Sequence, residues 1–384
     1  MTTILYFRSP TPNKASVEEL VGARDVAAKV GWQIRDFDLG TANVSELIRF
    51  WQPVGIIVEC GEWSRDLDLR RLGDRPKVFI DQDPDKLPKK SFVVLHDSRD
   101  AGQLAARELL STNFRHFAYV PAAEDWRWAR EREEGFAHAL KLNGFGYARF
   151  EPPQAKPDSP AYSQRLRSFL KKQPKPCALF AANDRAAERT LTEAHALGLS
   201  CPEDIAIVGT DNDATICEHT RPMLSSVQPN FRRGGELAAL LLLAVLRDGR
   251  RFRGEHIRRY GNNGITRRTS TLAPKASADS EAQAALELIH REACNGLKAE
   301  TILDCFTCSR GSAARRFRQA TGNSILEEIH AVQLARIKTL LADDGLQLKS
   351  LADFCGFASA NSLRKFFLRE TGMTMTEWRR RCLA

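Results

Sequence analysis

Short apolar runs alternate with segments of helical spacing through the first 272 residues, and this alternation constrains the fold more than any other feature of the chain. Apolar residues recur at helical spacing in segments such as 15–31 and 100–113, which lie between the runs. Strands that alternate with helices form parallel sheets with right-handed crossovers. The sequence therefore predicts an α/β, Rossmann-like fold, with strands at 4–7, 33–37, 54–60, 77–81, 92–96, 116–120, 177–183 and 205–210.

Polar residues gather where the expected strands end. Ligands of such folds bind beyond the carboxyl ends of the strands. Carboxylates and amides there suit a neutral polyol, because planar groups pair with neighbouring hydroxyls. The alternative for each residue is capping of the following helix, and Asp184 in particular is placed to cap a helix over 184–198. The polar residues in question are Arg8, Ser9, Glu59, Asp97, Asn183, Asp184 and residues 211–213.

The motifs of several enzyme classes are absent from the sequence. It contains no GxGxxG or GxxxxGK[ST] phosphate loop in a strand-to-helix context, no GxSxG elbow and no HExxH. The one tight cysteine pair, Cys305 and Cys308 in DCFTCS, lacks a second pair, so core cysteines are favoured over zinc or redox chemistry. We therefore expect no catalytic residues, no metal and no cofactor.

The segment LADFCGFASANSLRKFFLRETG (351–372) carries two apolar stripes at helical spacing, separated by a glycine. Leu348, with Leu351 and Cys355, begins the first stripe, and Gly356 suits the left-handed position that ends a helix. Polar and cationic residues lie on the opposite face of the second stripe. This layout is typical of a helix-turn-helix unit, whose second helix enters the major groove of DNA. A solvated helical hairpin is the alternative for this segment alone.

The pattern is repeated fifty residues earlier, in residues 300–322. Ser309 matches Ser359, Phe317 matches Phe367, and a Thr-Gly pair closes both copies. Residues 325–341 between the copies form one apolar helical pattern. A rigid helix can hold two recognition helices one DNA turn, about 34 Å, apart. The duplication therefore favours a DNA-binding function.

Residues 281–384 resemble the AraC/XylS family of DNA-binding domains, through LADFCGF and the following SxxxxRxFFxxETGMTMTEWR. The resemblance implies double-stranded DNA as partner. Departures include Phe306 in place of a glycine and Gln333 in place of an arginine, so the first unit is expected to contact phosphates more than bases. The residues expected at the DNA are Arg310, Ser312, Arg315 and Arg316 in the first unit and Asn361, Ser362, Arg364 and Lys365 in the second.

The first 270 residues resemble the lac/galactose repressors and the periplasmic sugar-binding proteins, most clearly over ANDRAAERTLTEAHALGLSCPEDIAIVGTDND and TRPMLSSVQPNFRRGGELAALLL. This implies a two-lobed fold that closes around a sugar. Trp126 would offer an apolar platform, although a core or lid role is equally open, and an ion pair with Glu133 or Glu134 is the alternative for Arg132. The family's hydroxyl ligands match Asp97, Arg132, Asn183 and Asp211, and Arg8, Ser9 and Glu59 are weaker candidates.

A sugar sensor followed by an AraC-type reader is similar to the regulators of xylose operons. The expected organisation is a sensor over 1–272, a linker over 273–280 and a reader over 281–384. The resemblance implies D-xylose as effector, activation through RNA polymerase and a homodimer. Alternatives are a repressor, a regulator of another aldose, a sugar-modifying enzyme fused to a DNA-binding module, and a transport-type sugar-binding protein.

Composition sets the remaining limits. The formal charge of +9 permits a polyanionic partner without proving one. The nine cysteines lack a disulfide framework, and no export signal or membrane span is visible. The sequence thus predicts a cytoplasmic, nucleoid-associated protein with no membrane partner.

Overall fold

The computed structural model describes residues 2–9, 13–38, 43–59, 69–112, 114–249, 252, 254, 256–271, 280–341 and 351–383. Leu348 and residues 273–279 of the expected linker lie outside the described residues. The chain forms two compact units. The first unit comprises Met1–Gln103, Glu124–His138 and Gln228–Gly264, and the second comprises Leu104–Ala123, Ala139–Val227 and Ile265–Ala384.

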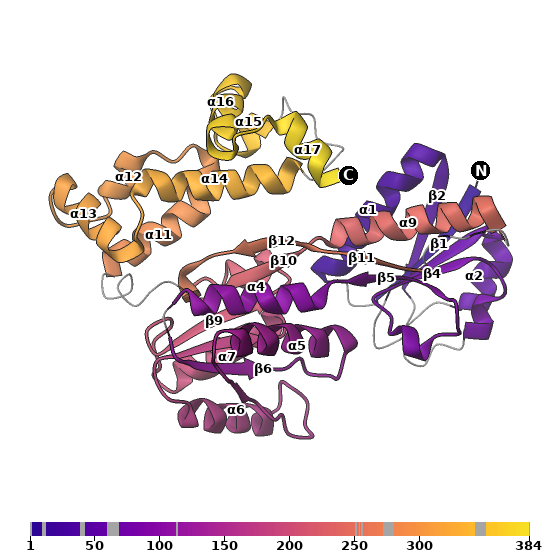
Figure 1. Ribbon diagram of the computed structural model, residues 1–384, viewed down its shortest axis with the longest axis horizontal. Helices are drawn as coiled ribbons and strands as arrows, with labels where there is room; N and C mark the ends of the chain where they lie inside the picture. Colours follow the sequence, from indigo (N-terminus) through magenta and orange to yellow (C-terminus); the bar gives the residue numbers. More distant parts are fainter. Residues whose placement is uncertain are drawn as a thin grey trace. The chain divides into compact units, whose positions relative to one another are not determined.

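The first sheet has six strands in the order β11-β5-β4-β3-β1-β2, and every described pairing between them is parallel (Figure 1). Ile4 and Tyr6 of β1 face one core while Leu5 and Phe7 face the other, so both faces of the sheet are buried. The strands are β1 (Thr2–Arg8), β2 (Trp32–Asp38), β3 (Gly55–Glu59), β4 (Lys77–Ile80), β5 (Phe92–His96) and β11 (Ile257–Tyr260).

Helices α1 (Lys14–Val30) and α9 (Phe231–Asp248) cover one face of this sheet side by side (Figure 1). The other face packs on α2 (Val44–Trp51) and on the short helix η1 (Leu69–Leu72). Gly235 allows α9 to approach α1, since a Cβ there would lie 1.8 Å from the Glu19 carbonyl oxygen.

The second sheet also has six strands, in the order β12-β10-β9-β8-β6-β7. Its core lies against α6 (Pro160–Lys172) and α7 (Asp184–Ala196). The strands are β6 (His116–Val120), β7 (Ala148–Arg149), β8 (Cys177–Ala181), β9 (Ile205–Thr210), β10 (Ser225–Pro229) and β12 (Asn262–Thr266). The remaining helices up to residue 271 are α4 (Ser98–Leu110), α5 (Arg127–Leu142), α8 (Ala214–Cys217), η2 (Pro84–Lys86) and η4 (Thr269–Thr271).

Only helices are described beyond residue 280. They form two small cores, and α14 (Ile325–Leu341) contributes its first half to one core and its second half to the other. The other elements are α11 (Ser280–Glu292), η5 (Ala293–Asn295), α12 (Ala299–Leu303), α13 (Arg310–Thr321), α15 (Leu351–Phe354), α16 (Ala360–Thr371) and α17 (Met375–Leu383).

The predicted α/β fold with a helical C-terminal domain is confirmed, and each of the eight expected strands is present within two residues of its expected ends. Strands β7, β10, β11 and β12 were not predicted. Strand β7 has only two residues, β11 and β12 carry polar side chains that are partly or fully exposed, and β10 (SSVQP) is buried but mostly polar, so none of them has the apolar run that marks a buried strand. Among the described residues, no helix is long and apolar enough to cross a membrane.

Candidate functional site

Glu59, at the carboxyl end of β3, is buried and accepts three hydrogen bonds. They come from the Tyr6 hydroxyl at 2.7 Å, the Ser16 hydroxyl at 2.7 Å and the Ser9 backbone N–H at 3.1 Å. Burial raises the pKa of Glu59 to about 7, and the three donors oppose the rise. Glu59 thus holds Ser9, after β1, and Ser16 of α1, and most of its acceptor capacity is already used inside the first unit.

Arg8, the last residue of β1, lies beside the edge strand β2. Its Nε donates to Asp36 Oδ2 at 3.1 Å, and Arg24 donates to the other carboxylate oxygen of Asp36 at 2.7 Å. The half-exposed guanidinium of Arg8 is therefore oriented by an ion pair. Its role at a ligand stays a prediction.

Asp97 follows β5 and begins α4. Its Oδ1 accepts from the Asp100 backbone N–H at 3.2 Å, which is the capping geometry considered from the sequence. Its own N–H donates to the Tyr260 carbonyl at 2.8 Å. Since a carboxylate has about four lone-pair positions, Asp97 retains acceptor capacity for hydroxyl groups.

His96, next to Asp97, is buried and neutral. Burial and then the positive charge of Arg132 lower its pKa to about 3. Its Nε2 lies 2.9 Å from Asn262 Oδ1, and its Nδ1 lies 2.8 Å from the Ser98 hydroxyl. Because the Asn262 amide nitrogen donates to other carbonyl and carboxylate oxygens, Oδ1 is an acceptor and the His96 proton is on Nε2. This network fixes the start of α4.

Arg132 is buried on α5, with its guanidinium 4.5 Å from the centre of the Trp128 ring. The contact is a cation–π interaction that orients the guanidinium. Glu134 accepts two hydrogen bonds from Arg99, at 2.9 and 2.7 Å, so this glutamate is engaged by another arginine. Trp126 lies half-buried just before α5.

In the second unit, Asn183 caps α7, because its Oδ1 accepts from the Ala186 N–H at 2.9 Å. The expectation that Asp184 caps this helix is wrong. Asp184 lies inside the first turn and is buried, with Oδ1 accepting from the Ser226 hydroxyl at 2.6 Å and Oδ2 from the Asp213 N–H at 2.8 Å. Burial and then the charge of Asp211 raise its pKa to about 7.

Asp211 and Asn212 follow β9 with positive φ angles of 114° and 49°. Such a conformation costs about 1–3 kcal/mol for residues other than glycine and persists only where the surroundings impose it. The Asn212 N–H donates to the Ser226 hydroxyl at 3.0 Å and its side-chain amide donates to the Thr266 hydroxyl at 3.1 Å. Strain held in this way is typical of a ligand-binding loop. We call residues 211–213 the effector loop.

Each unit therefore presents polar groups at the carboxyl ends of its strands. The first presents Arg8 and Asp97 there and carries Arg132 on α5, and the second presents Asn183 and Asp211. Carboxylate and amide oxygens accept from hydroxyl groups, and the guanidinium groups donate to hydroxyl oxygens. Each set of groups has the donors and acceptors that hydroxyl groups require.

The two helix-turn-helix copies share their local geometry as well as their sequence. Ser309 caps α13 by accepting from the Ser312 N–H at 3.4 Å, and Ser359 caps α16 by accepting from the Ser362 N–H at 3.1 Å. In each copy the capping hydroxyl also contacts the hydroxyl of the serine three residues later, at 3.1 and 2.9 Å. Ser312 and Ser362 thus take part in capping, and their hydroxyls are directed by it.

The cationic side chains of the two helices are mostly exposed, as DNA contact requires. Arg310 has a 68% exposed side chain and lies 3.4 Å from Asp304, and Arg315 lines a shallow groove with Arg318. The exposed candidates are Arg310 and Arg315 on α13 and Asn361, Ser362, Arg364 and Lys365 on α16.

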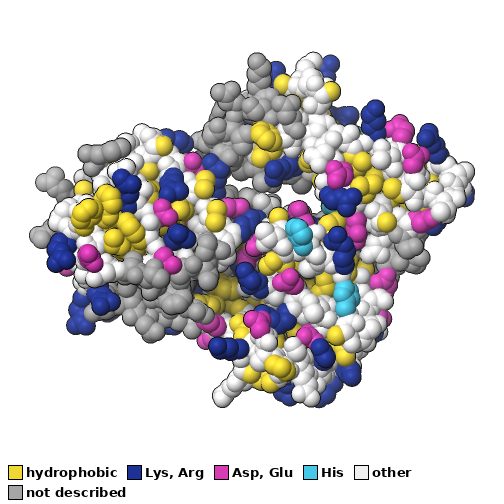
Figure 2. Space-filling view, turned by 180° about the vertical axis from the view of Figure 1, so that it is seen from behind, with side chains coloured by type: hydrophobic (Ala, Val, Ile, Leu, Met, Phe, Trp, Pro, Cys, Tyr) yellow, Lys and Arg dark blue, Asp and Glu magenta, His cyan; other side chains and the backbone are white. Residues whose placement is uncertain are grey.

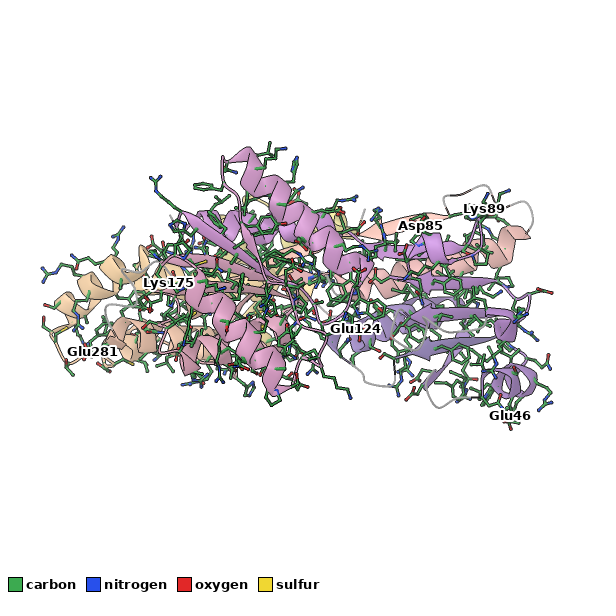
Figure 3. The ribbon with its side chains drawn as sticks, turned by 90° about the horizontal axis from the view of Figure 1, so that it is seen from below. Glu46, Asp85, Lys89, Glu124, Lys175 and Glu281 are labelled. Carbon is green, nitrogen blue, oxygen red and sulfur yellow. The ribbon has the colours of Figure 1, made fainter. Side chains whose placement is uncertain are left out.

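Arg316 differs from the other candidates. Its Nη1 donates to Glu281 at 2.6 Å, and its guanidinium lies 5.4 Å from the Phe306 ring centre. Glu281 also accepts from the Thr307 N–H at 3.1 Å and the Thr307 hydroxyl at 2.7 Å. Figure 3 labels Glu281 in α11. Arg316 thus links α13 to α11, and this ion pair occupies part of its guanidinium.

The two helix-turn-helix units are joined by more than α14. Gln333 of α14 is buried and donates 3.1 Å hydrogen bonds to the carbonyls of Ala293 and Cys355, one in each unit. Gly356 has φ of 74°, as the left-handed turn requires, and a Cβ there would lie 2.9 Å from the Ala293 carbonyl oxygen. The turn of the second helix-turn-helix unit therefore packs closely on η5, which lies in the first half of the helical domain.

Cys305 is exposed, so the expectation of a core role is wrong for this residue, while Cys308 packs partly against the first helical core. No group of three or more metal-ligating side chains occurs among the described residues. On the face shown in Figure 2, lysine and arginine side chains are interspersed with acidic ones rather than gathered in one patch.

Sequence reasoning missed Asn262 and Glu281, and it named Asn212 only as one of the polar residues that follow an expected strand. Asn262 and Glu281 stand outside the motifs that the sequence offered, and their partners are distant in the chain. Asn212 was visible as a neighbour of Asp211, but only its positive φ and its bond to Thr266 distinguish it.

Two domain models match parts of this chain. Residues 106–271 match a periplasmic binding protein-like domain, and residues 302–381 match a helix-turn-helix domain. The xylose operon regulatory protein of Escherichia coli strain K12 is 27% identical over 383 residues, covering 98% of this chain and 96% of the relative.

Solved structures agree on the fold. One titled "structure of xylose-binding transcription activator xylR" has a TM-score of 0.57 at 22% identity and covers 98% of this chain and 97% of its own. A complex of the transcriptional regulator CelR with cellobiose has a TM-score of 0.57 at 20% identity, covering 70% and 84% of the two chains. Identities at this level support the architecture alone.

Proposed function

Because this chain is a sugar-responsive transcription regulator, with a periplasmic-binding-protein-like sensor and a helix-turn-helix reader, we propose that its effector is a pentose and that it activates transcription. D-xylose is the first ligand to test, since the relative similar over nearly the whole chain is named a xylose operon regulatory protein. The sugar-binding residues in this proposal are Asp97, Arg132, Asn183 and Asp211, with Trp126, Arg8, Ser9 and Glu59 in supporting positions.

The observation that carries the effector proposal is the strained effector loop. Asp211 with φ of 114° is held by contacts of its neighbours to Asp184, Ser226 and Thr266. A carboxylate fixed in this way is preorganised to accept hydrogen bonds from two neighbouring hydroxyls. A sugar that binds one conformation of the sensor more tightly than another would shift the protein toward that conformation. The shift would then change how α13 and α16 are presented to DNA.

A thermal shift assay against a panel of aldoses tests this proposal. A ligand at 100 times its Kd stabilises the protein by about 2.7 kcal/mol. D-xylose should raise the melting temperature of the wild type and of Asp158→Ala, whose carboxylate is 92% exposed, but not that of Asp211→Ala. A rise with cellobiose or another aldose alone would replace the pentose, and no rise with any sugar would refute the effector proposal.

The DNA-binding proposal rests on the matching caps and exposed faces of α13 and α16. We place the sensor in residues 1–272 and the reader in residues 281–384. A homodimer that binds two copies of a site and contacts RNA polymerase in the cytoplasm completes the proposal. Footprinting on a promoter with and without D-xylose distinguishes activation from repression by the position of the protected site relative to the polymerase.

A sugar-modifying enzyme fused to a DNA-binding module is the alternative from another class. The matched models, a periplasmic binding protein-like domain and a helix-turn-helix domain, favour a regulator. Turnover in a panel of sugars would favour the enzyme.

A further inference from the structure

The last six described residues before the connection to the helical domain, Thr266–Thr271, are fastened to the rest of the second unit. We call them the strap. Arg268, Thr269, Ser270 and Thr271 are buried. The Ser270 hydroxyl donates to the Ile207 carbonyl of β9 at 2.6 Å and accepts from the Ser225 N–H at 2.8 Å. Polar groups buried and paired in this way resist gradual displacement.

Glu108 of α4 is the principal anchor of the strap. Arg267 donates to both of its carboxylate oxygens, at 2.8 Å each, and the Thr271 hydroxyl donates to Oε1 at 2.9 Å. The Glu108 side chain is only 4% exposed. A bidentate, charge-assisted pair has fixed geometry, so Glu108 fixes Arg267 near the start of the strap and Thr271 at its end.

The strap begins at the effector loop. Thr266 accepts a 3.1 Å hydrogen bond from the side chain of Asn212, the neighbour of Asp211. Ser226 accepts from the Asn212 N–H and donates to Asp184, which in turn holds the N–H of Asp213. A change in the conformation of the effector loop therefore acts directly on Thr266.

The strap ends where the connection to the reader begins. Residues 272–279 follow Thr271, and the described chain resumes at Ser280 in α11, where Glu281 binds Thr307 and Arg316. The strap also contacts the reader directly among the described residues, because η4 (Thr269–Thr271) lies against α11, and burial and then the positive charge of Arg268 lower the pKa of His290 of α11 to about 4. A displacement of the strap therefore acts on α11 of the reader.

We propose that the strap is the element that couples the effector loop to the DNA-binding domain, with Thr266 as its input and Glu108 as its anchor. Both are positioning residues, since neither is among the residues assigned to sugar or DNA. This inference rests on the proposed function, and it names the route of its regulation. The strap and its partners Glu108, Asn212 and Ser225 all lie within the second unit.

Thr266→Val tests the input, because it removes the hydroxyl that accepts from Asn212 at nearly constant volume. Thr266→Ser keeps the hydroxyl, and Glu108→Gln removes the charge of the anchor. Thr192→Val is the matched control, since the Thr192 hydroxyl bonds only locally, to the Glu188 carbonyl at 3.0 Å on an exposed helix face.

The measurement is the ratio of DNA affinities with and without saturating D-xylose, using full-length protein and a duplex that the wild type selects from a random library. Sugar affinity is measured separately by calorimetry. Losing one hydrogen bond should lower the ratio by about 2- to 10-fold in Thr266→Val. In Thr266→Val, the affinity for sugar and the affinity for DNA without sugar should stay within about twofold of the wild-type values. In Thr266→Ser and Thr192→Val, the ratio of DNA affinities should equal that of the wild type.

Two results overturn the inference, and they differ. If the wild type responds to D-xylose and Thr266→Val and Glu108→Gln respond equally, the strap is not the route although the proposed function stands. If the wild type responds to none of the aldoses, the proposed function fails and the strap inference fails with it. Should Glu108→Gln unfold, Thr266→Val decides alone.

Discussion

Gly356 fixes the turn of the second helix-turn-helix unit against the first half of the reader, and Gly356→Ala should displace it. The φ of 74° costs an L-residue about 1–2 kcal/mol. The added Cβ would lie 2.9 Å from the Ala293 carbonyl oxygen, the Cys294 carbonyl carbon and the Gly296 nitrogen, all backbone atoms that cannot rotate away. Overpacking adds about 1–3 kcal/mol, so the expected total is about 2–5 kcal/mol.

Gly372→Ala is the matched control for this prediction. Its φ of 70° is nearly the same, but a Cβ there meets nothing within 4 Å. Only the conformational cost applies, so the expected loss is about 1–2 kcal/mol. The difference between the two variants isolates the contact between the second turn and η5 from the conformational term.

Hydrogen exchange read on peptides measures both variants. A loss of 1.4 kcal/mol raises an equilibrium constant for opening tenfold. Amides of α16 that exchange when the second helix-turn-helix unit opens should therefore exchange about 30- to 4,000-fold faster in Gly356→Ala than in the wild type. Gln333 bridges the same junction, so peptides that contain Ala293 should also exchange faster. Equal acceleration in Gly356→Ala and Gly372→Ala would refute the reasoning, because the contact would then contribute nothing.

Three further predictions follow from the site geometry. The pKa of Asp184 is raised to about 7, so the folded state binds more protons than the unfolded state between about pH 4 and 7. The free energy of unfolding that this group contributes is therefore lost as the pH rises through that window. Melting curves of Asp184→Asn at several pH values should lack this part of the pH dependence. Lys365→Ala should relax sequence preference at one base by about 1–3 kcal/mol, whereas Arg315→Ala should weaken all duplexes alike and reduce the salt slope by about 0.9, as binding titrations at several salt concentrations would show. Glu281→Gln should free Arg316 and raise hydrogen exchange at Thr307, and unchanged exchange there would contradict the linking role of Glu281.

The sequence predicted the strands with buried faces because their apolar runs are long enough to be read directly. It also predicted the duplication, since the serine caps, the core phenylalanines and the Thr-Gly ends repeat at one spacing, and the caps repeat in the structure. Strand β11 could not be predicted from IRRY, because its place beside β5 depends on partners about 160 residues away.

The sequence could not show which polar side chains of the candidate site are already hydrogen-bonded within the protein. Glu59, Asp184 and Arg316 are polar residues next to expected ligand-binding positions, and sequence gives them the same standing as Asp97 or Lys365. Packing distinguishes them, because Glu59 accepts a hydrogen bond from Ser16, Asp184 accepts one from Ser226, and Arg316 pairs with a glutamate of another helix.

By itself the sequence determined the fold class and predicted the order of sensor and reader and the two helices proposed to face DNA, because these depend on periodicity, capping residues and repetition that are local in the chain. Tertiary structure alone decided the strain of the effector loop, the anchoring of the strap by Glu108 and the junction at Gly356. Each of these brings together atoms that are distant in the chain, and hydrogen-bond geometry and steric exclusion act only once the fold has brought them within contact distance.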